Sequence, residues 1–518
     1  MPAVTATATA ILKEYYSAGG VQEQINYESL VLNLCMEHEE KWEGSALIVP
    51  LHVSVNNSPT EVTGAGTAVA PAAGEQGYVR YVIDAAVTVA SCGFEEIVVR
   101  RSGTDRGAFE RVAKEETDKL VKDVKNRINR MLISGGSIKG LLNEHKASAL
   151  TAGNATWANA DAGVNVATTV WEFNGDFNRF LGVAQATSST WLRVNIIRLD
   201  SAPPLDGALP GVALGWSRQT AANGTLVLNA GAVDADVAIF VSAINRALRT
   251  VSLTVMQRAN FVGAGSGITT VPVQAGSSIA LEINATTFTD SAAAAQPAGT
   301  GLTAVAAVTL EQNGFLHNLY APTIYGVART SAAVVVAANN TVLQSTAFTN
   351  ATAGAHARAA LDRVRIQSVL DQIALYGDDQ VDCLLANDSF RARYYAILTA
   401  TTSWFLPTEG VPERGDIGVK DKKAGTKTTN YSFADIPMFF SKDVPPGLIF
   451  FHKKDAWRYA PLGGDGDWLN AGKDHELYNP IDPATGRPVL AYMRTWMQPW
   501  NLYCRTPNKI GTLCGYTV

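Results

Sequence analysis

The longest run of helical periodicity in the chain extends from Gly107 to Ile133. Apolar residues recur in it every three or four positions, and acidic residues stand four positions before basic ones on its other faces. Gly135-Gly136 follows, a pair suited to ending a helix. A rod of about 40 Å with one narrow apolar stripe predicts a strut lying across a sheet or subdomain, and a coiled-coil segment is the alternative. The stripe consists of Phe109, Ala113, Leu120, Val124, Ile128 and Met131.

Two runs of alternating apolar and other residues precede this helix. The first has Leu47, Val49, Leu51, Val53 and Val55 at every second position. The stretch from 56 to 77 that separates the runs is rich in Gly, Pro, Ala and Asn, and it is far longer than a hairpin turn needs. We expect a hairpin whose tip cannot pack its own end and is either disordered or laid on a neighbouring molecule. The second run has Tyr81, Ile83, Ala85, Val87 and Val89.

The segments on either side have different characters. Residues 2–10 alternate Ala, Thr and Val, which is typical of an extended arm. Residues 26–42 predict a short amphipathic helix with Leu30, Val31, Leu34 and Cys35 facing inward and Glu37, Glu39 and Glu40 solvated. Residues 147–310 contain no lysine and repeat short β-branched runs between turn residues, which predicts a small all-β subdomain inserted into the chain. These runs are WLRVNIIRLD, TLVLNA, VAIFVSAI, RTVSLTV and SIALEI.

The C-terminal third returns to mixed elements. A helical stripe that contains Ile366 and Ile373 is closed by Gly377, and Asn387 starts a further helix after the buried strand VDCLLA. The strands SFADIPMFF and LIFF follow around a proline turn, and a β-rich tail runs from about Trp457 to Val518. The sequence therefore predicts an α+β fold.

Composition narrows the function. The chain has 518 residues and a formal net charge of -5, which argues against a protein that holds nucleic acid tightly. Only 17% of residues are charged, a balance that suits burial against further copies of the same chain. No apolar run is long enough for a membrane span, and the N-terminus has no signal-peptide pattern. The five dispersed cysteines are expected to be free, mostly buried thiols in a soluble protein made in a reducing cytoplasm.

The search for chemistry predicts no catalytic residue, no cofactor and no metal. His475-Glu476 has only the first half of a zinc-protease motif. Asp465, Asp467 and Glu476 occupy calcium-loop positions, but Leu469 and Asn470 stand where a ligand and a glycine are required. We expect a protein that is not an enzyme.

The order of these parts resembles the major capsid protein of tailed double-stranded DNA bacteriophages. KWEGSALIVPLHVSVNN and GYVRYVIDAAVTVA resemble its extended-loop strands, and DRGAFERVAKEETDKLVKDVKNRINRMLISGG resembles its spine helix. LYAPTIYGVARTS, DQVDCLLANDSFRARYYAIL and YSFADIPMFFSKDVPPGLIFF resemble successive elements of the axial and peripheral domains. Residues 150–310 match only in β character, and no scaffold-like coiled coil precedes the arm. That second departure implies a separately encoded scaffold or a chain that needs no cleaved prodomain.

The resemblance implies a tailed-phage major capsid fold with an N-arm, an extended β-hairpin loop, a long spine helix, and peripheral and axial domains, plus the inserted all-β subdomain. The expected divisions are residues 1–43 for the arm and short helix, 44–100 for the extended loop hairpin, and 101–146 for the spine helix of the peripheral domain. The others are 147–310 for the inserted subdomain, 311–356 for the peripheral-domain return and linker, and 357–518 for the axial domain and the peripheral-domain C-terminal strands.

The implied function is a shell protein that assembles into hexamers and pentamers and encloses the double-stranded DNA genome in an icosahedral head. Its implied partners are itself, a portal protein, possible scaffolding and decoration proteins, and packaged DNA through non-specific contact, with no membrane. The implied location is the virion, after assembly in the host cytoplasm. The residues that we expect at subunit interfaces are Asn57, Thr60, Glu61, Val62, Thr63, Gly64, Arg80, Arg106 and Lys122.

The alternative is a secreted or surface β-rich carbohydrate-binding protein or adhesin. It is suggested by Trp171, Trp191 and Trp216 in the inserted region. Tryptophans at such positions more often fill a core, and no signal peptide or paired carboxylates support an enzyme acting on polysaccharide.

Overall fold

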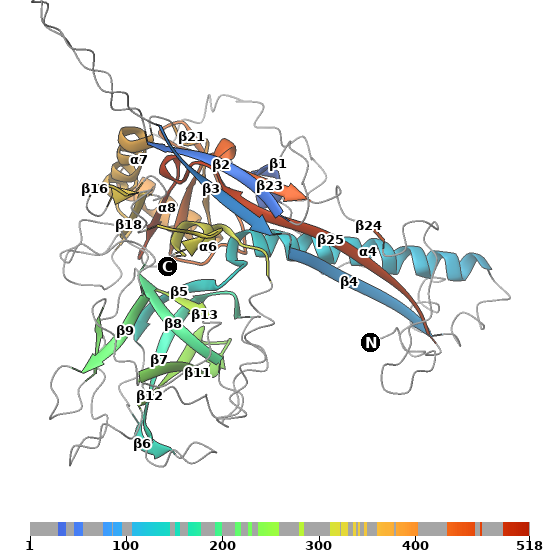
Figure 1. The fold of residues 1–518 in the computed structure, drawn as a ribbon, viewed down its shortest axis with the longest axis horizontal. Helices are drawn as coiled ribbons and strands as arrows, with labels where there is room; N and C mark the ends of the chain where they lie inside the picture. Colours follow the sequence, from blue (N-terminus) through green and yellow to red (C-terminus); the bar gives the residue numbers. More distant parts are fainter. Residues whose placement is uncertain are drawn as a thin grey trace, which may run out of the picture.

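Figure 1 shows the computed structural model of the chain, in which a long helix and a pair of long strands extend from a larger body. A separate group of strands lies beside that body. The structure describes residues 30–37, 46–54, 76–84, 86–95, 106–145, 151–155, 164–177, 192–198, 213–218, 226–229, 237–257, 279–283, 311–321, 323–329, 335–337, 340–341, 346–349, 360–377, 380–401, 432–461, 467–468 and 491–516.

The predicted long helix is α4, Arg106–Ser134. Val124, Ile128 and Met131 are buried, and they belong to a core formed with other parts of the same chain, including Phe315 and Trp457. The helix is thus a strut packed within the subunit, and the coiled-coil alternative is wrong for this part of it. It ends where expected: the Gly135 amide donates to the carbonyl of Met131 at 2.8 Å, and Gly136 has a φ of 82°.

The strut lies against a five-stranded sheet. Its longest strands are β4, Ala86–Glu95, and β25, Ala491–Cys504, which pair antiparallel and run alongside α4 in Figure 1. β25 also pairs with β23, Trp457–Pro461, and β24, Asp467–Trp468. β1, Met36–Glu37, adds a parallel edge to β23.

The helix predicted over residues 26–42 is wrong at its C-terminal end. The described helix is α2, Leu30–Asn33, and Glu37 lies in β1 instead of on a solvated helical face. The chain turns at Leu34, whose amide donates to the carbonyl of Val31, so that Met36 pairs with Arg458 of β23. The inward-facing set is correct for Val31, Leu34 and Cys35, which are buried.

The C-terminal third forms a six-stranded sheet in the order β18, β26, β22, β19, β21, β20. Helix α7, Arg363–Gly377, buries the predicted stripe residues Ile366, Val369 and Ile373. Helix α8, Asp388–Thr401, starts where predicted, and the Asn387 side chain accepts a hydrogen bond from the Ser389 amide at 3.2 Å. The strands are β18, Thr346–Thr349; β19, Cys383–Ala386; β20, Ser432–Phe433; β21, Ile436–Phe440; β22, Leu448–His452; and β26, Gly511–Cys514.

The five β-branched runs of the inserted region all form strands of a nine-stranded sheet. Six strands, β8, β11, β12, β7, β5 and β13, close into a ring because β13 pairs with both β5 and β8. Trp171, Phe173, Val241, Val251 and Leu281 are fully buried in this sheet. The strands are β5, Ile138–His145; β6, Thr151–Ala155; β7, Val164–Gly175; β8, Leu192–Arg198; β9, Ala213–Arg218; β10, Leu226–Asn229; β11, Val237–Asn245; β12, Thr250–Gln257; and β13, Ile279–Ile283.

Smaller elements complete the body. Helix α6, Phe315–Tyr320, lies against α4 and β25, and short paired strands follow it. They are β14, Thr323–Ile324; β15, Val327–Ala328; β16, Val335–Ala337; and β17, Asn340–Thr341. The predicted α+β class is confirmed. No described helix is long and apolar enough to cross a membrane.

Candidate subunit interface

The predicted hairpin is an antiparallel ribbon of β2, Ala46–Ser54, and β3, Gly77–Asp84. Its inner face is buried, with Leu47 opposite Ile83 and Val49 opposite Tyr81. These side chains pack with residues of β14, β15, β23 and β25, and the ring of Tyr81 lies 5.6 Å from that of Tyr325. The described part of the hairpin is therefore anchored on its own subunit, while the predicted tip at 56–75 lies outside the described residues.

The outer face of the same ribbon is also apolar, yet exposed. Ile48 stands opposite Val82, and His52 stands opposite Tyr78 with ring centroids 5.2 Å apart. The exposed fractions of Ile48, Tyr78 and Val82 are 56%, 63% and 39%. Arg80 stands between these pairs, opposite Pro50. Large hydrophobic side chains on both faces of a two-stranded ribbon make the outer face a candidate for contact with a partner.

The period-two run that begins at Tyr81 does not keep to one face. Tyr81 and Ile83 are buried, but Val87 and Val89 are 47% and 57% exposed, and Thr88 is buried instead. The buried positions shift from odd to even because the pairing partner changes. β3 pairs with β2 up to Asp84, and β4 pairs with β25 from Ala86 onward. Thr88 is held inward by Gln312 and Trp500, whose side-chain nitrogens donate to its hydroxyl at 2.9 and 3.1 Å.

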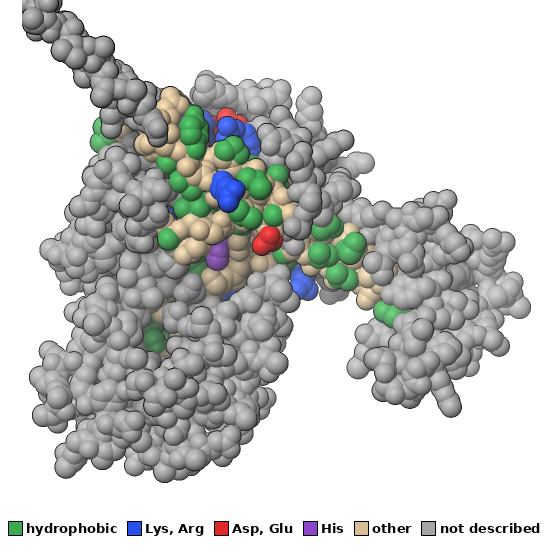
Figure 2. All heavy atoms as spheres, in the orientation of Figure 1, with side chains coloured by type: hydrophobic (Ala, Val, Ile, Leu, Met, Phe, Trp, Pro, Cys, Tyr) green, Lys and Arg blue, Asp and Glu red, His purple; other side chains and the backbone are tan. Residues whose placement is uncertain are grey.

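Together these residues form a surface that we name the outer strip. Figure 2 shows hydrophobic side chains over both the β2–β3 ribbon and the adjoining part of β4 and β25 on the same face of the molecule. Val87 pairs with Pro499 and Val89 with Met497, so the apolar character continues onto β25. The outer strip consists of Ile48, Tyr78, Arg80, Val82, Asp84, Val87 and Val89.

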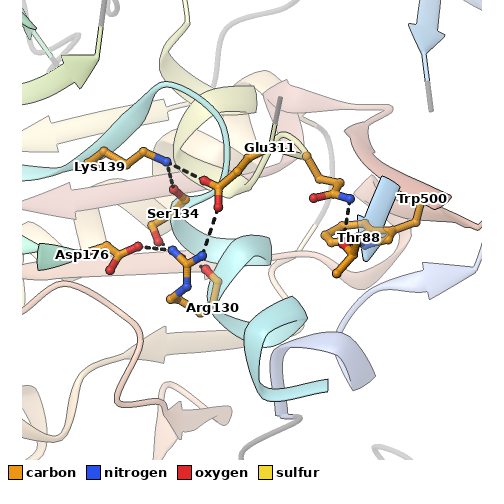
Figure 3. A network of polar contacts seen from close by, with 8 residues as sticks. Thr88, Arg130, Ser134, Lys139, Asp176, Glu311 and Trp500 are labelled. Carbon is orange, nitrogen blue, oxygen red and sulfur yellow. Dashed lines mark hydrogen bonds and ion pairs between the residues drawn. The ribbon is translucent and has the colours of Figure 1, made fainter. Parts of the chain in front are cut away.

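A polar cluster of low exposure fixes the C-terminal end of the strut (Figure 3). Arg130 of α4 forms an ion pair with Asp176, which follows β7, and a second with Glu311 at 3.1 Å. The amino group of Lys139, on β5, lies 2.9 Å from Glu311 and donates to the Ser134 carbonyl at 3.0 Å. Two cations and two anions thus join the end of the strut, the inserted sheet and the segment before α6.

A second polar connection holds the N-terminal segment. Asn129 accepts a hydrogen bond from the Val31 amide at 2.9 Å and donates to Asp443 at 2.8 Å. Burial raises the pKa of Asp443, and the hydrogen bond from Asn129 acts in the opposite direction. His452 donates to the Leu34 carbonyl at 2.8 Å, and burial lowers the pKa of this imidazole to about 4.

The sequence-predicted interface residues are only partly placed. Arg80 is exposed on the outer strip, and Lys122 is exposed on α4. The two lie on different elements, β3 and α4. Arg106 is the first residue of α4. Asn57, Thr60, Glu61, Val62, Thr63 and Gly64 lie outside the described residues.

Sequence reasoning missed most of the outer strip. Ile48 and Val82 occupy the positions of their strands that alternation assigns to solvent, and their size was the only available signal. It also missed the polar cluster, because Lys139 and Glu311 are 172 positions apart. In the part of the chain that the structure describes, no three His, Cys, Asp or Glu side chains are grouped so as to hold a metal ion. The cysteines are free, and four of the five are buried, as expected.

Neither the protein-family models nor the curated proteins contain a match to this chain. Solved structures that are similar to it over nearly its whole length include the following three. The cyanophage A-1(L) capsid asymmetric unit covers 100% of both chains, with 11% identity and a TM-score of 0.41. The capsid of the native GTA particle covers 99% of this chain and 100% of its own, with 9% identity and a TM-score of 0.39. A chain of Gordonia phage Cozz covers 95% and 88%, with 8% identity and a TM-score of 0.35.

Proposed function

We propose that the chain is a major capsid protein, which self-assembles into the icosahedral head shell of a tailed bacteriophage. The observation that carries the proposal is the outer strip. Five of the nine large hydrophobic side chains that are exposed among the described residues lie on it. A solvated subunit gains nothing from such a surface, whereas a second subunit that covers it removes the apolar area from water.

The internal architecture supports a load-bearing role. Val124, Ile128 and Met131 of the 29-residue strut are buried, and its C-terminal end is tied by ion pairs to two other parts of the chain. Apolar packing resists deformation because protein interiors are close-packed. A subunit braced in this way suits a shell, in which each copy has to keep its shape against its neighbours.

The finer parts of the proposal concern assembly and partners. We propose hexamers and pentamers of this chain, a portal protein at one vertex, and possible scaffolding and decoration proteins. Packaged DNA would be contacted without sequence preference, and the exposed Lys122, Lys125 and Arg127 of α4 are candidates for phosphate contacts. Assembly in the host cytoplasm and residence in the virion complete the proposal, in which the chain has a structural role and no catalytic one.

The inserted region has a place in this proposal as a lobe of its own. Five strands of the six-stranded ring come from this region and the sixth, β5, precedes it, and Trp171 on β7 is fully buried. A buried tryptophan offers no stacking surface to a sugar, so this residue gives no support to the carbohydrate-binding alternative. We propose that residues 147–310 are exposed on the particle, which antibody access to a tag near Gly263 tests.

Electron microscopy of the purified protein tests the proposed function. We expect closed shells, or rings of six and five subunits, to form without other phage proteins or with an added scaffold. A protein that stays dispersed as single subunits under both conditions would contradict the proposal.

A further inference from the structure

The outer strip carries two opposite charges in a defined order. Along β3 its outward-facing residues are Tyr78, Arg80, Val82 and Asp84. Arg80 and Asp84 are four positions apart on one strand, which separates them by about 13 Å. Within the described part of the chain neither side chain has an ion-pair partner. The strip therefore presents an apolar centre with an exposed cation on one side and an exposed anion on the other.

This order is self-complementary. If two copies of the strip meet face to face with their β3 strands antiparallel and Val82 at the centre, Arg80 of each copy lies over Asp84 of the other. Packed sheets stand about 10 Å apart, a gap that an arginine and an aspartate side chain bridge together. The same operation places Ile48 and Val82 of one copy against Ile48 and Val82 of the next, because these two residues are directly opposite in the ribbon.

The ribbon's edge disfavours a different mode of self-association. Pro50 lies in the middle of β2, and a proline in a paired strand turns its nitrogen, which carries no hydrogen, toward the unpaired edge. Such an edge is a poor template for adding another strand. The apolar face, not the edge of β2, is thus the surface on which a second copy gains the most.

We propose that the outer strip is a two-fold contact between two copies of this chain, centred on Val82 and closed by two reciprocal Arg80–Asp84 ion pairs. This proposal rests on self-assembly, the proposed function, but it specifies which surface, which partner and which symmetry. An isologous contact of this kind joins two subunits and no more, so it links neighbouring rings of a shell instead of closing one ring.

Charge reversal tests the pairing. Arg80→Asp alone sets one carboxylate against Asp84 of the partner at each of the two contacts, and Asp84→Arg alone sets two guanidinium groups against each other there. We expect each single variant to slow particle formation at least about tenfold, and the double variant Arg80→Asp/Asp84→Arg to restore it to within about threefold of the parent. A double variant as impaired as the worse single variant would overturn the proposal. Because both side chains are exposed, the free subunits of each variant should unfold at the parent's temperature. That measurement is the control for misfolding.

Cysteine cross-linking tests the symmetry independently of shell formation. Val82→Cys should give a covalently linked dimer with a short bismaleimide cross-linker, since the two copies of residue 82 face each other on the axis across a gap of about 10 Å, which is too wide for a direct disulfide. Tyr78→Cys, equally accessible on the same strand, should not, because the two copies of residue 78 would lie about 26 Å apart. Shells without the Val82→Cys dimer would refute the two-fold contact and leave the capsid function intact. The Val82→Cys dimer without any larger assembly would support the two-fold contact and contradict the capsid function.

Discussion

The amino group of Lys139 lies 2.9 Å from the carboxylate of Glu311, and the exposed fractions of the two side chains are 0% and 6%. The residues are 172 positions apart, and they join β5 of the inserted sheet to the segment that leads into α6. A buried ammonium group is tolerated only when it is paired. Glu311 also accepts from Arg130, so one carboxylate neutralises cations from two elements.

Removal of this carboxylate should destabilise the subunit strongly. We expect Glu311→Gln to lower the free energy of unfolding by about 3–5 kcal/mol, because it leaves Lys139 buried without its counter-ion. Asp371→Asn on the exposed face of α7 removes the same charge from a solvated site, and it should cost under about 1 kcal/mol. Urea denaturation of both variants measures the difference. Equal losses would show that the pair contributes no more than a surface charge.

The strut gives a second matched pair. Val124 is 4% exposed and lies in the core, so Val124→Asp buries an unpaired carboxylate and should prevent accumulation of soluble, assembly-competent protein. Lys122→Asp, two residues earlier and exposed, should cost under about 1 kcal/mol and at most alter shell formation. Parental melting temperatures for both variants would mean that α4 is not a buried strut.

The exit of the strut is sterically defined. A Cβ atom on Gly135 would stand 2.3 Å from the carbonyl oxygens of Met131 and Gln312. Gly135→Ala should therefore cost about 3 kcal/mol through a forced backbone shift. Gly326 has a φ of 82° but open space around it, so Gly326→Ala should cost only about 1 kcal/mol from backbone strain. Chemical denaturation ranks the two, and a larger loss at Gly326 would show that the exit of α4 can relax.

Acid should destabilise the subunit through His452. This side chain is 1% exposed, and its pKa in the folded state is about 4, against an ordinary value of 6.5, because burial disfavours the charged ring. The unfolded chain binds the proton first, so stability is full above about pH 6.5 and falls as the pH drops toward 4. The loss from this residue reaches about 3 kcal/mol. Burial and the nearby Lys139 lower the pKa of His317 to about 4 in the same way.

His452→Gln isolates this contribution. Glutamine keeps a donor for the Leu34 carbonyl and does not titrate, so the variant should lose less stability than the parent between pH 7 and pH 4.5. The free energy of unfolding at the two pH values provides the comparison. Identical losses in parent and variant would show that His452 takes up no proton on unfolding in this range.

Local sequence patterns predicted the elements whose partners are close in the chain or whose ends have strong local signals. The strut was expected from Gly107 to Ile133 and runs from Arg106 to Ser134. Its C-terminal end could be predicted because a glycine pair follows it. The β2–β3 ribbon shows the expected inward face because alternation alone determines it. These features depend on residues within one element and its turn.

The remaining features depend on contacts across hundreds of residues. Val87 and Val89 face outward because β4 pairs with β25, whose partner residues lie about four hundred positions away. Met36 and Glu37 are a strand because β23 offers them an edge. The polar cluster could not be predicted from local sequence either, because its charged residues come from separate parts of the chain. A period-two pattern shows which residues of a strand share a face, but the strand that pairs with it determines which face is buried.

Sedimentation velocity of the purified 518-residue chain across a concentration series tests the central claim most directly. The claim is that the subunit buries its outer strip, and so reaches its functional state, only against other copies of itself. The account predicts a fast-sedimenting species of shell size. The fraction of protein in this species should grow with concentration, and it should be much smaller in the Arg80→Asp variant. A single slow species with the mass of one chain, at every concentration and with or without an added scaffold, would contradict it.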